Sequence, residues 1–267
     1  MRKRTYLLAA LLCFVLSLAL GTPAALLYAG LRTRLPELQL LGVDGSIYEG
    51  QAAALRLNDA GLLERLHWRL RLSDLLLARL GIELGASGST VLDTHLSRSL
   101  TALRAQNLRL SGPLKPWLGV FGQAYVPVDG QLNAELPLLR LEHNWPRDAS
   151  GKLQLQNLAW TLARDPVVLG SFQADLSREG EDVVALIHTL GGPLEVNGDA
   201  RARGDYSYEL HLQLKPKADA PPLVLSFLSS LGQPDNQGYY RINRSGRAPG
   251  APPPPNAPLG APPGPPP

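Results

Sequence analysis

Histidine and aspartate side chains are the groups in this sequence best suited to acid–base chemistry or metal binding. The five histidines are far apart, and none falls in a metal-ligand spacing such as His-Glu-x-x-His. They are His67, His95, His143, His188 and His211. Five aspartates are each expected in or beside a turn, where the carboxylate bonds the local backbone: Asp148, Asp165, Asp175, Asp182 and Asp199. No spacing pairs an acid with a base, so the sequence predicts no catalytic residue and no metal ligand.

Two glycine-containing segments come near to known catalytic or phosphate-binding motifs without matching them. Ser150-Gly151-Lys152 lacks the upstream glycine of a phosphate-binding loop and the Ser or Thr that should follow its lysine. Gly85-Ala86-Ser87-Gly88-Ser89 places its second glycine one residue too early for a nucleophile elbow and is expected to form a flexible turn. We therefore expect no cofactor and predict that the chain is not an enzyme.

The aromatic and histidine residues have simpler expected roles. His211 falls on the polar side of a predicted strand and is expected to be solvated, whereas His67 precedes Trp68 in an apolar setting and is expected to be structural. Tryptophans in a β-rich domain usually pack in the core or on a sheet face. Trp117, which lies among prolines and glycine, is the one candidate for an exposed contact, although a packed, structural role is favoured for it as well.

Charge and cysteine content exclude several classes of protein. The formal charge is +3 and the basic residues are scattered, with no cluster longer than Arg2-Lys3-Arg4. Nucleic-acid binders usually gather such charge on one face, so no nucleic-acid partner is expected. The single cysteine, Cys13, lies in an apolar stretch, which excludes a disulfide or a thiolate metal site in the rest of the chain.

The N-terminus is expected to cross a membrane once. Residues 1–4 form a basic, cytoplasmic start, and residues 5–31 carry no charge, which is long enough for a transmembrane signal-anchor helix. The main domain would then lie in the periplasm, attached to the cell inner membrane. The alternative is a cleaved signal peptide with a small-residue site at Ala19-Leu20-Gly21. The apolar run continues past that site to Tyr28, which favours retention.

Residues 32–246 are predicted to form a β-rich domain. Leu132, Ala134 and Leu136 alternate with polar residues, as expected for a strand with one buried face. The same alternation occurs in residues 152–156, around Leu153 and Leu155, and in residues 206–215, where Tyr206, Tyr208, Leu210, Leu212 and Leu214 share one side. Hairpin turns are expected at four dipeptides: Asp44-Gly45, Asp129-Gly130, Asn197-Gly198 and Gly204-Asp205.

The predicted fold class is mainly β, an antiparallel meander with a few short covering helices. One helix is expected from Asp74 to Leu80, with Ser73 as its N-cap and Gly81 as its stop. A second is expected from Leu223 to Leu231, with an apolar stripe of Leu223, Phe227, Leu228 and Leu231. Residues 247–267 contain eleven prolines and are predicted to be a disordered, Pro-rich tail.

Several segments together resemble the type II secretion system protein N family (general secretion pathway protein N). They are Leu40–Ala52, Leu66–Leu70 around Trp68, Pro127–Leu132, Asn144–Gly151, Gly191–Gly198 and the closing stretch Leu231–Asp235 with Gly238–Ile242. The closing stretch is the most specific, and the resemblance spans Met1 to Gly246. A tryptophan is commoner in the family where Tyr48 stands, and tyrosine keeps an aromatic ring there.

The resemblance implies a non-catalytic accessory of the type II secretion apparatus, anchored in the inner membrane and involved in its assembly or stabilisation. The expected partners are the inner-membrane platform proteins, with the outer-membrane secretin as a further candidate. A different class of function stays open, because a leucine-rich sheet face could instead hold acyl chains in a lipid-handling protein. A helix that covers this face favours the scaffold, and an open groove favours lipid.

Overall fold

The computed structural model describes residues 21–32, 37–57, 60–75, 79–99, 101–120, 122–123, 125–161, 166–218, 220–230 and 232–248. Most of the expected transmembrane stretch, residues 5–20, and nearly all of the expected tail lie outside these residues. The last part of the stretch belongs to α2 (Ala24–Arg32). Within the ranges given, no helix is both long and apolar enough to cross a membrane.

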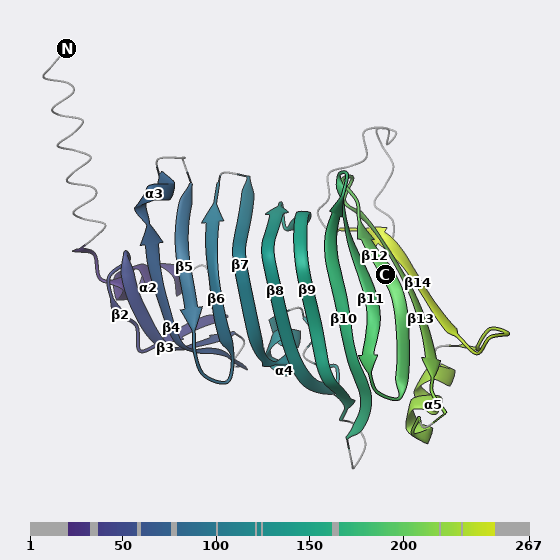
Figure 1. Ribbon diagram of the computed structural model, residues 1–267. Helices are drawn as coiled ribbons and strands as arrows, with labels where there is room; N and C mark the ends of the chain where they lie inside the picture. The colour runs from purple at the N-terminus through teal and green to yellow at the C-terminus, as the bar shows by residue number, and fades with distance from the viewer. Residues whose placement is uncertain are drawn as a thin grey trace, which may run out of the picture.

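One antiparallel sheet of fourteen strands forms the body of the molecule (Figure 1). Each strand pairs with the next along the chain, except that β1 and β2 both pair with β3. The strands are β1 (Leu38–Leu41), β2 (Asp44–Gly45), β3 (Glu49–Leu57), β4 (Ala60–Arg71), β5 (Leu80–Ala86), β6 (Val91–Arg98), β7 (Ala102–Pro113), β8 (Val128–Glu142), β9 (Trp145–Trp160), β10 (Val167–Glu179), β11 (Asp182–Gly191), β12 (Leu194–Ala202), β13 (Ser207–Pro216) and β14 (Tyr240–Arg247). The predicted meander is confirmed.

Alternation along each strand separates an apolar face from a polar face. One apolar row crosses ten strands in register, from β5 to β14: Ala86, Leu92, Leu110, Ala134, Leu153, Ala174, Ile187, Gly198, Leu212 and Ile242. The predicted inward positions Leu153 and Leu212 belong to this row, as does Ala134, which is 3% exposed. Because side chains alternate with a period of two, one continuous register produces one continuous apolar face.

Of the four expected turn dipeptides, one forms a turn and the other three lie in strands. Gly204-Asp205 does form the turn between β12 and β13, and Asp44-Gly45 forms β2, just before the turn into β3. In contrast, Asp129-Gly130 is part of β8, where the register shifts, and Asn197-Gly198 is part of β12. A Cβ on Gly198 would lie 2.0 Å from His211 O, so this glycine permits close strand packing instead of a turn.

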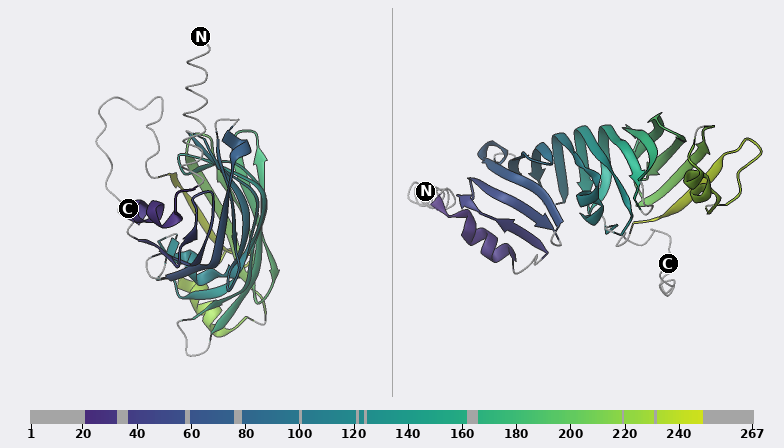
Figure 2. Two further views of the ribbon diagram at one scale, coloured as in Figure 1. Left: turned by 90° about the vertical axis from the view of Figure 1, so that its left-hand side faces the viewer. Right: turned by 90° about the horizontal axis from the view of Figure 1, so that it is seen from below.

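Two helices cover the apolar face on the concave side of the curved sheet (Figure 2). The helix α5 (Pro222–Ser230) buries Val224 and Leu228 against β10, β12 and β13, which confirms a covering helix close to the expected bounds. Its buried stripe differs from the expected one, because Leu223 is 53% exposed. The helix α4 (Leu114–Val120), which the sequence did not suggest, contacts both β4 and β8.

The helix expected from Asp74 to Leu80 is wrong in its bounds and its role. Among the described residues there, Leu72–Leu75 form the short helix α3, and Leu80 and Gly81 already belong to β5. A Cβ on Gly81 would lie 1.7 Å from Asp74 Oδ2, so Gly81 makes room for the Asp74 side chain instead of ending a helix. α3 packs on β5 and does not belong to the cover of the apolar face.

A matched pair of substitutions in α5 tests whether this helix closes the core. Leu228→Ala removes a side chain that is 0% exposed, and we expect a loss of roughly 2–5 kcal/mol in the free energy of unfolding. Leu225→Ala, at a position 45% exposed on the same helix, should cost less than about 1 kcal/mol. Denaturant unfolding measures both, and equal costs would mean that α5 does not cover the sheet.

Candidate interaction surface

The five histidines are spread over the molecule and do not gather into one site. Three of the histidines each lie beside one aspartate of their own. The pairs are His95 with Asp74 at 3.0 Å, His188 with Asp175 at 3.5 Å and His211 with Asp199 at 3.4 Å. His67 lies over Gly85 on the polar face, and His143 lies 3.5 Å from the Tyr206 hydroxyl. In the described part of the chain, no group of three or more His, Cys, Asp or Glu has a metal-binding arrangement.

The aspartates are placed differently from the expectation that each sits in or beside a turn. Asp182 does begin β11 after a turn, and Asp165 lies outside the described residues. Asp148, Asp175 and Asp199 lie within strands β9, β10 and β12. Their carboxylates contact side chains on neighbouring strands: Asp148 pairs with Arg178, and Asp175 and Asp199 lie beside the imidazole rings of two histidines.

The polar face carries a row of alternating charges in its centre. Five residues in register across β6 to β10 alternate in sign: Asp93, Arg109, Glu135, Lys152 and Asp175. Opposite charges on neighbouring strands attract, and each such pair favours this register by a few tenths of a kcal/mol to about 1 kcal/mol. The row continues through Leu186, Asp199, His211 and Asn243 to the last strand. The result is a broad polar surface that crosses most of the sheet.

A hollow of about 870 Å³ lies on this face over strands β2 to β7. Its lining is mostly polar and includes the charged residues Glu49, Arg69, Arg71, Glu83, Asp93 and Arg109. Arg69 pairs with Glu49 at 2.5 Å and Arg71 with Glu83 at 3.3 Å. The hydrogen bond that Arg69 donates to Glu49, together with the charge of that carboxylate, raises the pKa of Arg69. The hollow is therefore suited to a polar segment or group and not to an acyl chain.

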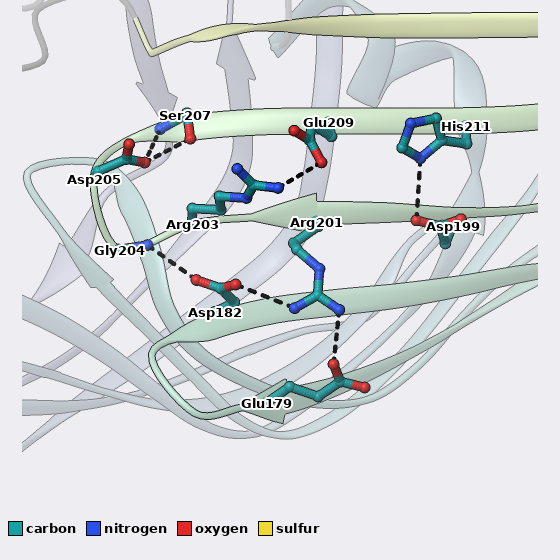
Figure 3. Close-up of polar contacts among 10 residues, drawn as sticks. All are labelled: Glu179, Asp182, Asp199, Arg201, Arg203, Gly204, Asp205, Ser207, Glu209 and His211. Carbon is teal, nitrogen blue, oxygen red and sulfur yellow. Dashed lines mark hydrogen bonds and ion pairs between the residues drawn. The ribbon is translucent and has the colours of Figure 1, made fainter.

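A network of ion pairs covers the same face at the ends of β10 to β13 (Figure 3). Arg201 bridges two carboxylates, with Glu179 at 2.8 Å and Asp182 at 3.1 Å, and these hydrogen bonds raise its pKa. Arg203 pairs with Glu209 at 2.8 Å. Because both signs are interspersed, the surface presents many donors and acceptors without one dominant charge.

Contacts between distant turns hold the curvature of the sheet. His143 and Asn144 have φ of 51° and 61°, as in a tight two-residue hairpin turn, and they join β8 to β9. From the start of β9, the Trp145 indole donates to Arg203 O at 2.8 Å, and the Arg147 guanidinium lies 4.5 Å from the centre of the Tyr206 ring. These contacts connect β9 to the β12–β13 turn across the two strands between them.

Trp117 has the packing role expected of tryptophans in a β-rich domain, which was favoured over an exposed contact. It is partly buried, and it packs on the apolar cluster of Ala52, Leu63, Leu66 and Ala86. The polar face, in contrast, could not be identified from single strands. Its residues were visible in the sequence as outward positions, but the alternation of charge between strands appears only once the register is known.

Asp235 organises the segment that leads into the last strand. Its carboxylate accepts hydrogen bonds from the amides of Tyr239 and Gln237, both at 2.9 Å, and pairs with Arg241 at 2.8 Å. The bond from the Tyr239 amide is the main cause that lowers the pKa of Asp235, with smaller contributions from Gln237 and Arg241. The ionised carboxylate is therefore the form that the folded chain prefers.

Acid titration tests the role of Asp235. Because its pKa is lower in the folded than in the unfolded chain, its contribution to stability is present above about pH 5 and is lost as the pH falls below about 4. Asp235→Asn should lower the melting temperature at pH 7 by no more than a few degrees and should flatten the decline in stability below pH 4. Thermal unfolding at several pH values measures this, and an unchanged acid profile would contradict the assignment.

Comparison with known proteins places the chain in one group. A family model described as type II secretion system (T2SS), protein N, matches residues 36–243. The type II secretion system protein N of Vibrio cholerae is 30% identical over 226 residues, which covers 80% of this chain and 86% of that protein. The protein of the same name from Aeromonas hydrophila is 25% identical over 257 residues, 92% of this chain and 99% of that protein. No solved structure gives a significant match.

Proposed function

The chain belongs to the type II secretion system protein N family, and we propose that it is a non-catalytic scaffold of the type II secretion apparatus. In this proposal the part of residues 5–31 that precedes α2 anchors the chain in the inner membrane by a single pass. The sheet, with α2 packed against β1, lies in the periplasm. It supports assembly or stabilisation of the apparatus between the inner membrane and the secretin. Its partners are the inner-membrane platform proteins, with the secretin as a further candidate.

The contrast between the two faces of the sheet carries the proposal. The apolar face is covered by α4 and α5, with Val224 and Leu228 almost fully buried. The polar face presents the alternating row and the hollow over β2 to β7. A wide, charged surface gives orientation and specificity to an association without requiring a catalytic group. This is the combination that a scaffold needs.

Charge neutralisation on the polar face tests the scaffold role. Arg109→Gln combined with Lys152→Gln removes the two positive charges of the alternating row. We expect at least a tenfold loss in recovery of inner-membrane platform proteins by coprecipitation from membranes, and reduced secretion when the variant replaces the wild-type chain. The two changes remove four cross-strand charge pairs, so the free energy of unfolding should fall by roughly 1–4 kcal/mol, and circular dichroism should still show a folded chain.

A control with the same change in charge makes this result specific. Lys115→Gln combined with Lys217→Gln removes two exposed positive charges that lie outside the row, one on α4 and one after β13. This variant should coprecipitate and secrete like the wild-type chain. If both double variants lose the platform proteins equally, net charge and not the polar face would control the association.

A lipid-handling role stays as a second candidate, because some apolar side chains on the covered face remain accessible. Leu80 is 54% exposed and Tyr208 is 39% exposed, and both lie on the same side of their strands as the buried core residues. Accessible side chains of this kind are few compared with the buried apolar residues in the two clusters that α4 and α5 cover. The scaffold is therefore favoured over the lipid carrier.

Opposite-face substitutions in β13 separate these two functions. Leu212 packs on the core cluster, so Leu212→Asp should unfold the body by burying an unpaired carboxylate. Gln213→Asp, at the neighbouring exposed position, should be mild. Circular dichroism and mass spectrometry of extracted lipids give the readout. A folded Leu212→Asp variant that has lost a phospholipid carried by the wild-type chain would overturn the scaffold role.

A further inference from the structure

The two edges of the sheet differ in whether their backbone groups are covered. At the first edge, the amide of Leu40 donates to the Tyr28 hydroxyl at 3.1 Å, so α2 occupies the free side of β1. Pro23, which comes just before α2, also forms an antiparallel β-bridge with Ser46, which comes just after β2. At the other edge, β14 pairs only with β13 among the described strands. Among the described residues, the sheet is thus covered at the β1 edge and uncovered at the β14 edge.

Hydrogen-bond alternation identifies the backbone groups at the open edge. The amide of Lys217 donates to Pro193 O and that of Ala248 to Tyr206 O. Because pairing of β13 with β14 continues without a register shift from Ser207↔Arg247 to Leu214↔Tyr240, the even-numbered residues of β14 bond β13. The amides and carbonyls of Arg241, Asn243 and Ser245 therefore point away from the sheet. They form a template for one more strand.

The side chains of β14 disfavour pairing with a second copy of the chain. Three arginines and no carboxylate lie in its eight residues, and all three arginines are exposed: Arg241, Arg244 and Arg247. Two β14 strands side by side would bring these like charges together. Pairing of β14 with β1 of another copy would require displacement of Tyr28. Proline, which has no amide hydrogen, is too frequent after Arg247 for that segment to serve as the added strand.

We propose that the free edge of β14 docks an extended, acidic segment of a partner protein, which adds to the sheet as a further strand. Main-chain hydrogen bonds to Arg241, Asn243 and Ser245 provide the affinity, and the arginines select for carboxylates. Asp235 and Lys215 hold the start of the edge, through Arg241 and the Tyr239 ring respectively. The inference deepens the proposed scaffold role and depends on it for its setting.

Site-specific photocrosslinking of the full-length chain, in membranes that contain the secretion apparatus, tests the proposal. A benzophenone-bearing phenylalanine replaces Ser245, and mass spectrometry maps the crosslinked segment. We expect a segment with net negative charge from a different protein. Asn243→Pro, which removes an outward amide, should reduce the yield at least tenfold, whereas Asn243→Ala should retain it.

A second variant keeps the test decisive if Asn243→Pro fails to fold. Arg244→Glu leaves the backbone intact and should also reduce the yield at least tenfold, with the melting temperature within a few degrees of the parent. Three results would overturn the proposal. The first is that no crosslink forms, and the second is a crosslink to another copy of the chain or to a basic segment. The third is a crosslinking yield that neither variant changes. An acidic segment from a protein outside the secretion apparatus would support edge docking and contradict the scaffold role.

Discussion

A single wide sheet must bury one of its faces, and this constraint determines the rest of the structure. The apolar row from Ala86 to Ile242 is too broad for one short helix to cover. Curvature brings distant strands close together, so that α4 reaches both β4 and β8, while α5 covers the strands near the C-terminal edge. Trp145 and Arg147 hold this curvature through their contacts with the β12–β13 turn.

Once the apolar face is buried, the polar face is the broad surface of the sheet that stays exposed. Its residues pair with each other: Arg69 with Glu49, Arg201 with Glu179 and Asp182. Exposed pairs of this kind add little to stability, and their main effect is to select which surface can approach. Such a face suits a component that positions other proteins, which agrees with membership of a secretion-system family.

Sequence patterns predicted the strands and one covering helix because each depends on local spacing. Leu132, Ala134 and Leu136 alternate within one strand, and the prolines at 221–222 together with Gly232 bound the α5 region. Glycine was the main source of error. Gly198 and Gly81, expected at a turn and a helix end, instead make room for His211 O and for the Asp74 side chain, which come from distant parts of the chain. Such contacts have no local signal, and neither does the charge alternation across strands.

Cysteine accessibility on neighbouring residues of β8 tests most directly whether partners bind the polar face while the other face is a closed core. In a Cys13→Ser background, Ala134→Cys reports the buried face and Glu135→Cys the exposed one. Labelling with a membrane-impermeant maleimide is compared in cells with and without the rest of the apparatus. The account predicts that Glu135→Cys is labelled without the apparatus and protected with it, while Ala134→Cys is labelled in neither. Labelling of Ala134→Cys that the apparatus suppresses, with Glu135→Cys unaffected, would contradict it.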